Sequence, residues 1–157
     1  IVKWTNTSNV RNHCFSKIQV TEESNADFFD EYVATGKYKQ YIVHRVDDQY
    51  GAVSYAIATV YLKDMDIENH RCELCIFTSD DEEWNSESQS MAIQLLLDKA
   101  FNEYDMHKVY SHVFAANLDE IELLESAGFK REALLEKEAM TLSGEYADVV
   151  RMCVIKG

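Results

Sequence analysis

The chain contains no proline and only five glycines among its 157 residues. Glycine thus makes up about 3% of the chain against an ordinary share of about 7%, and proline ordinarily contributes about 5%. This shortage excludes a collagen-like repeat, a flexible Gly/Ser linker and a proline-rich recognition segment. The remaining composition, 46% apolar and 27% charged, is that of a globular protein. Because the length also fits one hydrophobic core, we expect residues 1–157 to form a single domain.

Long hydrophobic runs and an excess of basic residues are absent as well. The longest apolar run, residues 52–62, contains Ser54 and Thr59 and is shorter than the roughly 18 residues of a membrane span. The net charge of −13 argues against nucleic acids and anionic membrane surfaces as partners. No secretory signal is recognisable, which favours a cytoplasmic location. The acidic surface serves solubility or attracts a cationic substrate.

Cysteines are few, and their spacing does not complete a metal site. Cys72 and Cys75 form a CxxC pair preceded by His70, but no second pair supplies the other half of a tetrahedral zinc site. If this stretch is a strand, residues 72 and 75 point to opposite faces of the sheet. Together with Cys14 and Cys153, they are therefore expected to be reduced thiols, and we predict no metal site.

Hydrophobic periodicity predicts an alternation of helices and strands after an irregular, polar opening over residues 4–15. Thr21, followed by two glutamates, is typical of a helix start. Asn117, with Glu120 three residues later, resembles a capping box, and Gly128 is suited to a helix C-terminus. Residues 79–90 are expected to form an acidic, serine-rich loop. The predicted strands are residues 41–46, 52–62, 71–78, 109–115, 129–140 and 146–155, and the predicted helices begin near residues 21, 91 and 117.

Several strings in this pattern resemble the GNAT superfamily of acetyl-CoA-dependent N-acetyltransferases. The similarity is greatest to the branch that contains ribosomal-protein N-terminal and nucleotide-sugar amine acetyltransferases. It covers nearly the whole chain and lacks only the family's first strand, which would precede Ile1. The strings are WTNTSNVR at 4–11, ELCIF at 73–77, AIQLLLDKAF at 92–101, HKVYSHVF at 107–114, Asn117, and SAGFKR at 126–131.

The resemblance implies an α/β GNAT fold and an acyl-transfer reaction. In this fold a mixed, mostly antiparallel sheet has helices on both faces and one parallel pairing between two splayed strands, here residues 71–78 and 109–115. The implied function is transfer of an acetyl group from acetyl-CoA to a primary amine, which is a protein N-terminus, an amino sugar or a small amine. The expected partners are a small-molecule or peptide acceptor and a second copy of the chain, with which it would form a homodimer.

The resemblance places acetyl-CoA between the splayed strands. Its pantetheine arm would pair with the first strand, and its diphosphate would lie at the amino end of the main helix, where free N–H groups and the helix dipole favour anions. Asn117 would contact the pantetheine arm or cap its own helix. The cofactor-binding residues implied in this way are Ile76, Phe77, Thr78, Asn85, Ser86, Glu87, Ser88, Gln89, Ser90 and Asn117.

The phosphate loop departs from the family pattern. That pattern reads Q/RxxGxG/A, because side chains at the glycines would obstruct the phosphates. Here Trp84 stands at its first position, and Glu87 and Gln89 replace its glycines. Each carboxylate about 8 Å from a phosphate charge would cost on the order of 0.5 kcal/mol in water. The nearby acidic residues are Asp80, Asp81, Glu82, Glu83 and Glu87.

The chemistry requires a base for the amine and an acid for the departing thiolate. Glu73 matches a family glutamate that faces the cleft, and it is the first candidate base; pairing with Arg71 or exposure to solvent would explain it equally well. His112 is the second candidate. The family's acid is a tyrosine whose matching position here is Leu124, which cannot donate a proton. Two hypotheses follow: an N-acetyltransferase, or a catalytically inactive GNAT-fold binding or interaction module that no longer binds acetyl-CoA or that uses an acyl donor without the nucleotide.

Overall fold

The computed structural model describes residues 1–47, 49, 53–76 and 78–157, and its main feature is one six-stranded sheet. The strands are β1 (Lys39–Asp47), β2 (Val53–Asp66), β3 (Arg71–Cys75), β4 (Lys108–Phe114), β5 (Lys130–Met140) and β6 (Tyr146–Ile155). Their order across the sheet is β1-β2-β3-β4-β6-β5. The turn expected near residues 47–51 lies mostly outside the described residues, as does Phe77.

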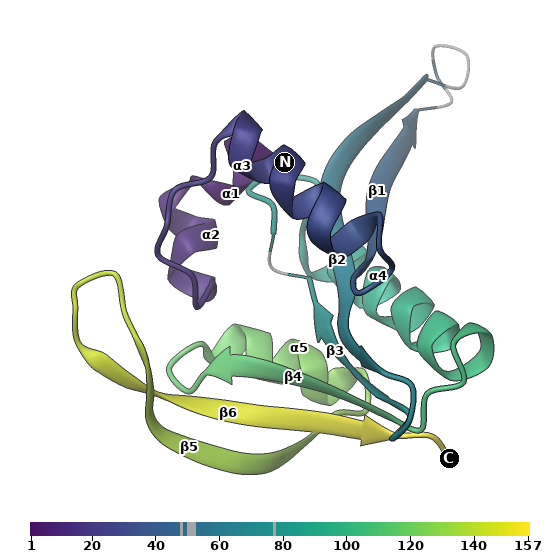
Figure 1. Ribbon diagram of the computed structural model, residues 1–157, viewed down its shortest axis with the longest axis vertical. Coiled ribbons are helices and arrows are strands. Elements are labelled where there is room, and N and C mark those ends of the chain that lie inside the picture. Colours follow the sequence, from purple (N-terminus) through teal and green to yellow (C-terminus); the bar gives the residue numbers. More distant parts are fainter. Residues whose placement is uncertain (48, 50–52, 77) are drawn as a thin grey trace.

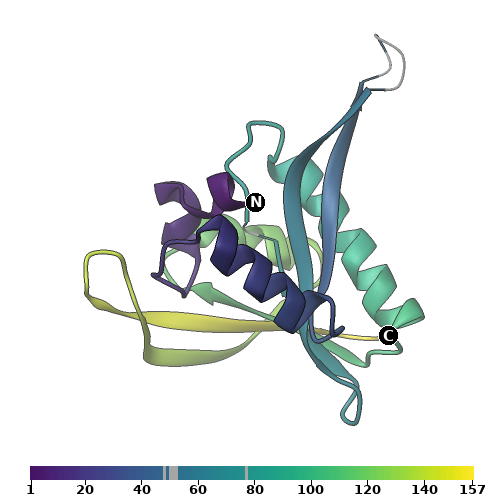
Figure 2. The same ribbon diagram turned by 45° about the horizontal axis from the view of Figure 1, so that its top comes forward.

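All pairings in the sheet are antiparallel except the one between β3 and β4. The parallel register runs from Arg71 opposite Lys108 to Glu73 opposite Tyr110, and among the described residues no further pair of these two strands follows. The two strands diverge from that point, as Figures 1 and 2 show at the centre of the sheet. This arrangement confirms the predicted mixed, mostly antiparallel fold with two splayed strands.

Helices cover both faces of this sheet (Figures 1 and 2). On one face lie α1 (Val2–Thr5), α2 (Ser8–His13), α3 (Glu22–Phe28) and the π-helical turn η1 (Phe29–Val33). On the other lie α4 (Ser86–Asp98), which continues into the π-helical turn η3 (Lys99–Glu103), and α5 (Leu118–Ser126). The main core lies between α4, α5 and the sheet, where Leu74, Ile93 and Leu124 are almost fully buried.

The N-terminal segment is helical, so the prediction of an irregular stretch over residues 4–15 was wrong. Thr7 caps α2 by accepting a hydrogen bond from the N–H of Val10. Val10 is the only buried residue of that helix, and α1 buries none. These helices therefore lack the apolar stripe by which a helix is recognised in sequence.

Strand bounds differ from the sequence prediction mainly around β2 and β3. Strand β2 continues to Asp66, four residues beyond the predicted end at residue 62, whereas β3 ends at Cys75 and not at Thr78. Ile76 and Thr78 consequently lie in the connection to α4. Strand β6 begins and ends where the alternation of side chains predicted.

Helix α4 begins inside the segment that was expected to be a loop. Asn85 is its N-cap, and the Asn85 Oδ1 accepts hydrogen bonds from the N–H groups of Glu87 and Ser88 at 3.1 and 3.2 Å. The Ser88 hydroxyl in return accepts from the N–H of Asn85 at 3.0 Å. This reciprocal capping box starts the helix at Ser86 and not near Met91, because it satisfies the first N–H groups of the helix locally.

Gly128 ends α5 as predicted, with φ +97°, a left-handed conformation in which L side chains are strained. We expect Gly128→Ala to lower the free energy of unfolding by about 1 kcal/mol. A Cβ at this position would meet no atom within 4 Å, so the loss is conformational and not steric. Urea denaturation measures it. The control is Gly157→Ala, at a terminal glycine that is equally open and has no positive φ; equal losses in both variants would contradict the explanation.

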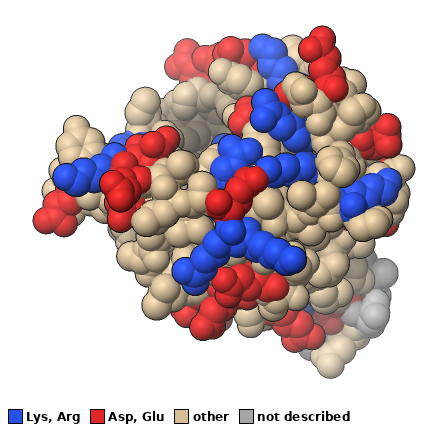
Figure 3. All heavy atoms as spheres, turned by 90° about the horizontal axis from the view of Figure 1, so that it is seen from below, with Lys and Arg blue, Asp and Glu red and all other residues tan. Residues whose placement is uncertain are grey.

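One face of the molecule carries acidic and basic side chains side by side (Figure 3). Seen from below, Lys and Arg side chains lie among Asp and Glu side chains (Figure 3). On the strands at this end, Lys108 and Arg151 both pair with Glu132. The face shown in Figure 3 therefore carries side chains of both signs. Within the described residues, none of the helices has the length and apolar character that crossing a bilayer requires.

Candidate functional site

The two candidate bases meet at the point where β3 and β4 diverge. Glu73 occupies the last paired position of β3, opposite Tyr110, and His112 lies two residues farther along β4. The His112 Nδ1 is 2.9 Å from the Glu73 Oε1. An ionised carboxylate only accepts hydrogen bonds, so Nδ1 carries the proton and the Nε2 of a neutral His112 keeps a free lone pair. Strand geometry thus brings together two residues that are 39 positions apart.

Glu73 does not pair with Arg71, as one of the sequence interpretations held. Arg71 instead donates to Asp66 at 3.0 Å. Glu73 is only 8% exposed, and the Lys63 Nζ lies 3.9 Å from its second oxygen. Lys63 is directly opposite Glu73 in the antiparallel register of β2 and β3. Glu73 is therefore a largely buried carboxylate between an imidazole and an ammonium group.

Asp64 adds a second carboxylate to this group. It lies at an irregularity in the pairing of β2 with β3, and its φ of +49° is unusual for a residue other than glycine. Its side chain interacts with Glu73 both electrostatically and through a hydrogen bond. Backbone conformations of this kind are costly and gather at functional sites. Asp64 was not among the predicted site residues, and nothing in its sequence context signals the irregularity.

The titration of these groups follows from their contacts. Burial alone would raise the pKa of Glu73, but the hydrogen bond from His112 and the charge of Lys63 hold it below its ordinary value. Burial raises the pKa of Asp64, and the neighbouring Glu73 adds to this rise against the opposing charge of Lys63. Glu73 is thus ionised at neutral pH and fixes the His112 ring, while its own basicity is reduced.

The lowered pKa of Glu73 predicts a pH dependence of stability. A carboxylate with a lowered folded-state pKa stabilises the fold above its unfolded value, about 4.3, and loses that contribution as pH falls through the folded value. We expect the stability difference between wild type and Glu73→Gln to be largest at neutral pH and to shrink below about pH 4. Urea denaturation across this range tests it. A difference that does not change with pH would show that the ionised form of Glu73 is not stabilised.

A cleft lined by tyrosines lies beside the Glu73–His112 pair. Its volume is about 410 Å³, and its walls include Tyr32, Tyr38, Asp64 and Tyr110. The rings of Tyr110 and His112 are 5.7 Å apart in an edge-on arrangement. Aromatic faces and a carboxylate together favour a cationic guest. Lys37 and Arg71 also line this cleft, but Arg71 is paired with Asp66.

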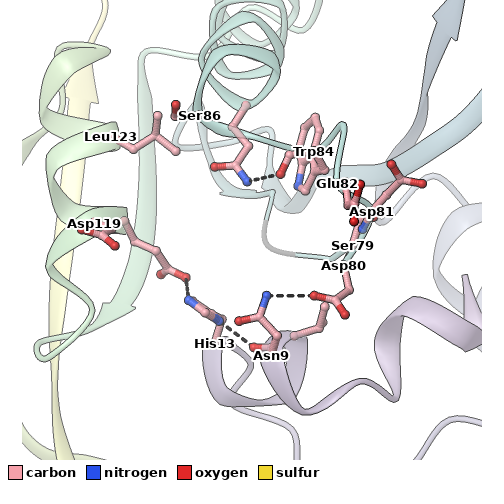
Figure 4. Close-up of a pocket in the computed structure, with 13 residues that line it drawn as sticks. Asn9, His13, Ser79, Asp80, Asp81, Glu82, Trp84, Ser86, Asp119 and Leu123 are labelled. Carbon is pink, nitrogen blue, oxygen red and sulfur yellow. Dashed lines mark hydrogen bonds and ion pairs between the residues drawn. The ribbon is translucent and has the colours of Figure 1, made fainter.

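A second cleft, of about 450 Å³, lies between α2, the start of α4 and α5 (Figure 4). The predicted cofactor residues Ser86 and Gln89 belong to its wall. So do Asp80, Asp81, Glu82, Asp119 and Glu120, whereas its lining contains neither lysine nor arginine. Across the cleft, the His13 Nε2 is 3.0 Å from the Glu120 Oε1, and the Asn9 side chain donates to Asp80 at 3.0 Å. His13 and Glu120 were not predicted; they come from helices far apart in sequence.

Asn117 stands at the N-cap position of α5, but its side chain does not cap the helix, so the predicted capping box with Glu120 was wrong. The Asn117 Nδ2 is instead buried and has no hydrogen-bond partner among the described residues. An unpaired buried donor of this kind costs about 1–3 kcal/mol, which a ligand carbonyl would recover. This observation fits an amide-containing arm such as pantetheine.

The diphosphate of a nucleotide, in contrast, does not fit the residues present. The first N–H groups of α4 are already bonded to Asn85, and the cleft beside them carries carboxylates without a compensating lysine or arginine. Ser90 lies within α4, beyond its first turn, and not in a phosphate-binding loop. Ile76 and Thr78, expected to pair with the cofactor arm, make internal hydrogen bonds.

Leu124 is completely buried in the core, so it neither donates a proton nor faces a cleft. Cys72 is buried and Cys75 half-buried, in line with opposite faces of the strand. In the part of the chain that the structure describes, groups of three or more histidine, cysteine or acidic side chains are nowhere arranged to hold a metal ion.

Comparison with known proteins identifies the family. Residues 1–130 match the family model described as an acetyltransferase (GNAT) domain. A spermidine N(1)-acetyltransferase of Vibrio cholerae is 36% identical over 64 residues, which are 41% of this chain and 36% of that protein. The match thus spans about a third of that relative. These relatives lend no support to the ribosomal-protein and nucleotide-sugar branch that the sequence suggested.

Solved structures agree on the fold. The spermidine N-acetyltransferase from Vibrio cholerae in complex with CoA and spermine superposes with a TM-score of 0.84 over 98% of this chain and 86% of its own, at 22% identity. A dodecameric structure of the same enzyme in an intermediate state gives a TM-score of 0.71 over 86% and 74% of the two chains, at 24% identity. With its splayed strands and a family match over most of its length, the chain belongs to the GNAT acetyltransferase family.

Proposed function

We propose that this protein transfers an acyl group from a thioester to the primary amine of a small cationic acceptor. The observation that carries the proposal is the Glu73–His112 pair, held where β3 and β4 diverge. An imidazole positioned by a buried carboxylate is a general base in many enzymes, because it changes protonation near neutral pH. The cleft beside the pair offers room for an acceptor.

In this reaction His112 acts as the base and Glu73 as the positioning residue. This reverses the order expected from sequence, because the contacts of Glu73 lower its pKa and so weaken it as a base. The amine nitrogen bonds to the thioester carbonyl carbon while the His112 Nε2 takes its proton. The C–S bond then breaks, and the thiolate leaves. Since Leu124 supplies no proton, the proton that His112 has taken passes through water to the thiolate, which leaves as a thiol and returns His112 to its neutral form.

The acceptor class follows from charge and from the relatives. The relatives named above act on spermidine, a cationic amine. The net charge of −13 attracts cations over long range. Asp64 with the Tyr38 ring would bind an ammonium group in the cleft, since the rings of Tyr32 and Tyr110 already face Lys37 and Arg151. We therefore infer a polyamine or a similar small amine in preference to a protein N-terminus or an amino sugar. The homodimer and the cytoplasmic location stay predictions from the sequence.

The test is acylation of spermidine by the purified protein, followed by mass spectrometry of the product. Acetyl-CoA and S-acetylpantetheine serve as donors in parallel reactions, and a peptide with a free N-terminus is the competing acceptor. We expect acetylspermidine and little acetylated peptide. If no acetylated amine forms from either donor at millimolar concentration, the proposal is wrong.

The second candidate function is a binding module without catalysis. Two observations favour it: the family's acid is replaced by the buried Leu124, and the groups that would bind a diphosphate are occupied within the chain. Spermidine binding without any acyl transfer would support this alternative. Calorimetry with spermidine alone distinguishes it from a protein that binds neither substrate.

A further inference from the structure

The segment between β3 and α4 uses its own side chains to satisfy the backbone that the family leaves open for phosphate. The Asn85 Oδ1 accepts from the N–H groups of Glu87 and Ser88, and the Asn85 carbonyl accepts from the N–H of Gln89 at 2.9 Å. A helix N-terminus binds anions through such N–H groups only when they are free. Here a neutral amide oxygen of the chain occupies them.

Trp84 is a second residue of this segment whose polar groups are bonded within the chain. Its side chain is 6% exposed, and its Nε1 donates to the Ile76 carbonyl at 3.0 Å. That carbonyl also accepts from the N–H of Thr78. The Gln89 side chain donates to the Trp84 carbonyl at 3.0 Å, which ties the Trp84 backbone to the first turn of α4. We call residues 78–89 with this indole the internal plug.

The charge beside the internal plug has the wrong sign for a nucleotide. Asp80, Asp81 and Glu82 lie on one wall of the cleft, and Asp119 lies on the opposite wall (Figure 4). Glu120 also lines the cleft. Among the described residues that line the cleft, the one basic side chain is His13, which faces Glu120. A diphosphate would meet carboxylates that the chain does not neutralise.

One feature of the chain favours an amide-containing ligand. The buried Nδ2 of Asn117, at the start of α5, has no hydrogen-bond partner among the described residues. The chain therefore has a hydrogen-bond donor for an amide carbonyl but lacks, over the part that the structure describes, the contacts that would bind phosphate.

We propose that this protein takes its acyl group from a thioester of a pantetheine-type arm without the nucleotide, and that the internal plug excludes the diphosphate half of coenzyme A. The inference rests on the proposed acyl transfer to an amine and specifies its donor. In that transfer the arm leaves as a thiol, and the acyl group ends on the acceptor nitrogen.

Binding measurements test the donor without requiring catalysis. Calorimetry with CoA, pantetheine and adenosine 3′,5′-diphosphate gives three dissociation constants. We expect CoA to bind no more tightly than pantetheine, because the nucleotide adds no favourable contact, and adenosine 3′,5′-diphosphate to show no binding at millimolar concentration. CoA binding at least about tenfold tighter than pantetheine would overturn the proposal. So would the absence of pantetheine binding.

A variant tests the assigned cause. Asp80→Asn and Asp81→Asn remove charge at constant shape, and Asn85→Gly frees two N–H groups with little loss of helix stability, because glycine is tolerated at an N-cap. The triple variant is expected to bind CoA at least about tenfold more tightly than wild type while pantetheine affinity is unchanged. Thr21→Gly is the matched control, since Thr21 and Ser24 cap α3 through the same reciprocal pattern. An unchanged CoA affinity in the triple variant would reject the internal plug as the cause.

The inference about the acyl donor and the proposed function can be overturned independently of each other. Acetylation of spermidine by acetyl-CoA with a much lower KM than by S-acetylpantetheine would overturn the donor inference and support the transferase. Pantetheine binding with no transfer from either donor would overturn the transferase but leave the donor preference standing.

Discussion

Replacing His112 by glutamine is expected to lower kcat/KM for amine acylation by a factor of about 100 to 10,000, the range over which a positioned general base contributes. The glutamine amide can still donate to the Glu73 carboxylate but cannot accept a proton from the amine. The half-buried position of His112 on β4 then keeps its packing. Initial rates with spermidine measure the effect.

The role of Glu73 is separated from that of His112 by combining the variants. Glu73→Gln leaves an imidazole without its anionic partner, and a residue that acts through another is not additive with it. The double variant is therefore expected to be no slower than His112→Gln alone.

The matched control is His44→Gln, an exposed histidine on the edge strand β1, whose activity should equal that of wild type. If His112→Gln were as active as this control, the base would have to be sought elsewhere. Equal losses in both variants would indicate a general effect of removing a strand histidine.

The fold could be predicted from sequence where side chains alternate between buried and exposed. Strand β6 was placed to the residue, because buried Val150 and Met152 follow a turn at Gly144, where φ is +87°. Helix α2 was missed because Val10 is its only buried residue. The start of α4 was missed because acidic and serine residues resemble a loop, although Asn85 followed by Ser88 is a capping pattern that could have located it.

The site was predictable only in part, since composition and local pattern do not give the register between distant strands. Glu73 and His112 were selected separately, and only the parallel pairing of β3 with β4 shows that they touch. Lys63 joins them as the residue directly opposite Glu73, and Asp64 through a register irregularity that no turn residue in the sequence indicates. Trp84 was recognised as a departure from the phosphate loop, but the hydrogen bond of its indole to Ile76 required the folded chain.

Replacing Trp84 by alanine is expected to lower the free energy of unfolding by about 3–5 kcal/mol, as for other buried aromatic side chains. The side chain packs in the main core and also satisfies the Ile76 carbonyl, so both burial and a hydrogen bond are lost. Urea denaturation followed by circular dichroism measures the change. A loss below about 1 kcal/mol would show that the indole is not tightly held.

Trp84→Phe separates the two contributions. Phenylalanine keeps an apolar ring but has no N–H, so we expect a smaller loss, on the order of 1–2 kcal/mol, since the Ile76 carbonyl still accepts from Thr78. The indole closes the internal plug from the core side, and Asn85 closes it from the helix side. We therefore expect that neither Trp84→Ala nor Trp84→Phe alone admits a nucleotide. CoA affinity should therefore stay at the wild-type value in Trp84→Phe even though stability falls, whereas a gain in CoA affinity on losing the indole N–H would place the block at the Ile76 carbonyl and not at the helix start.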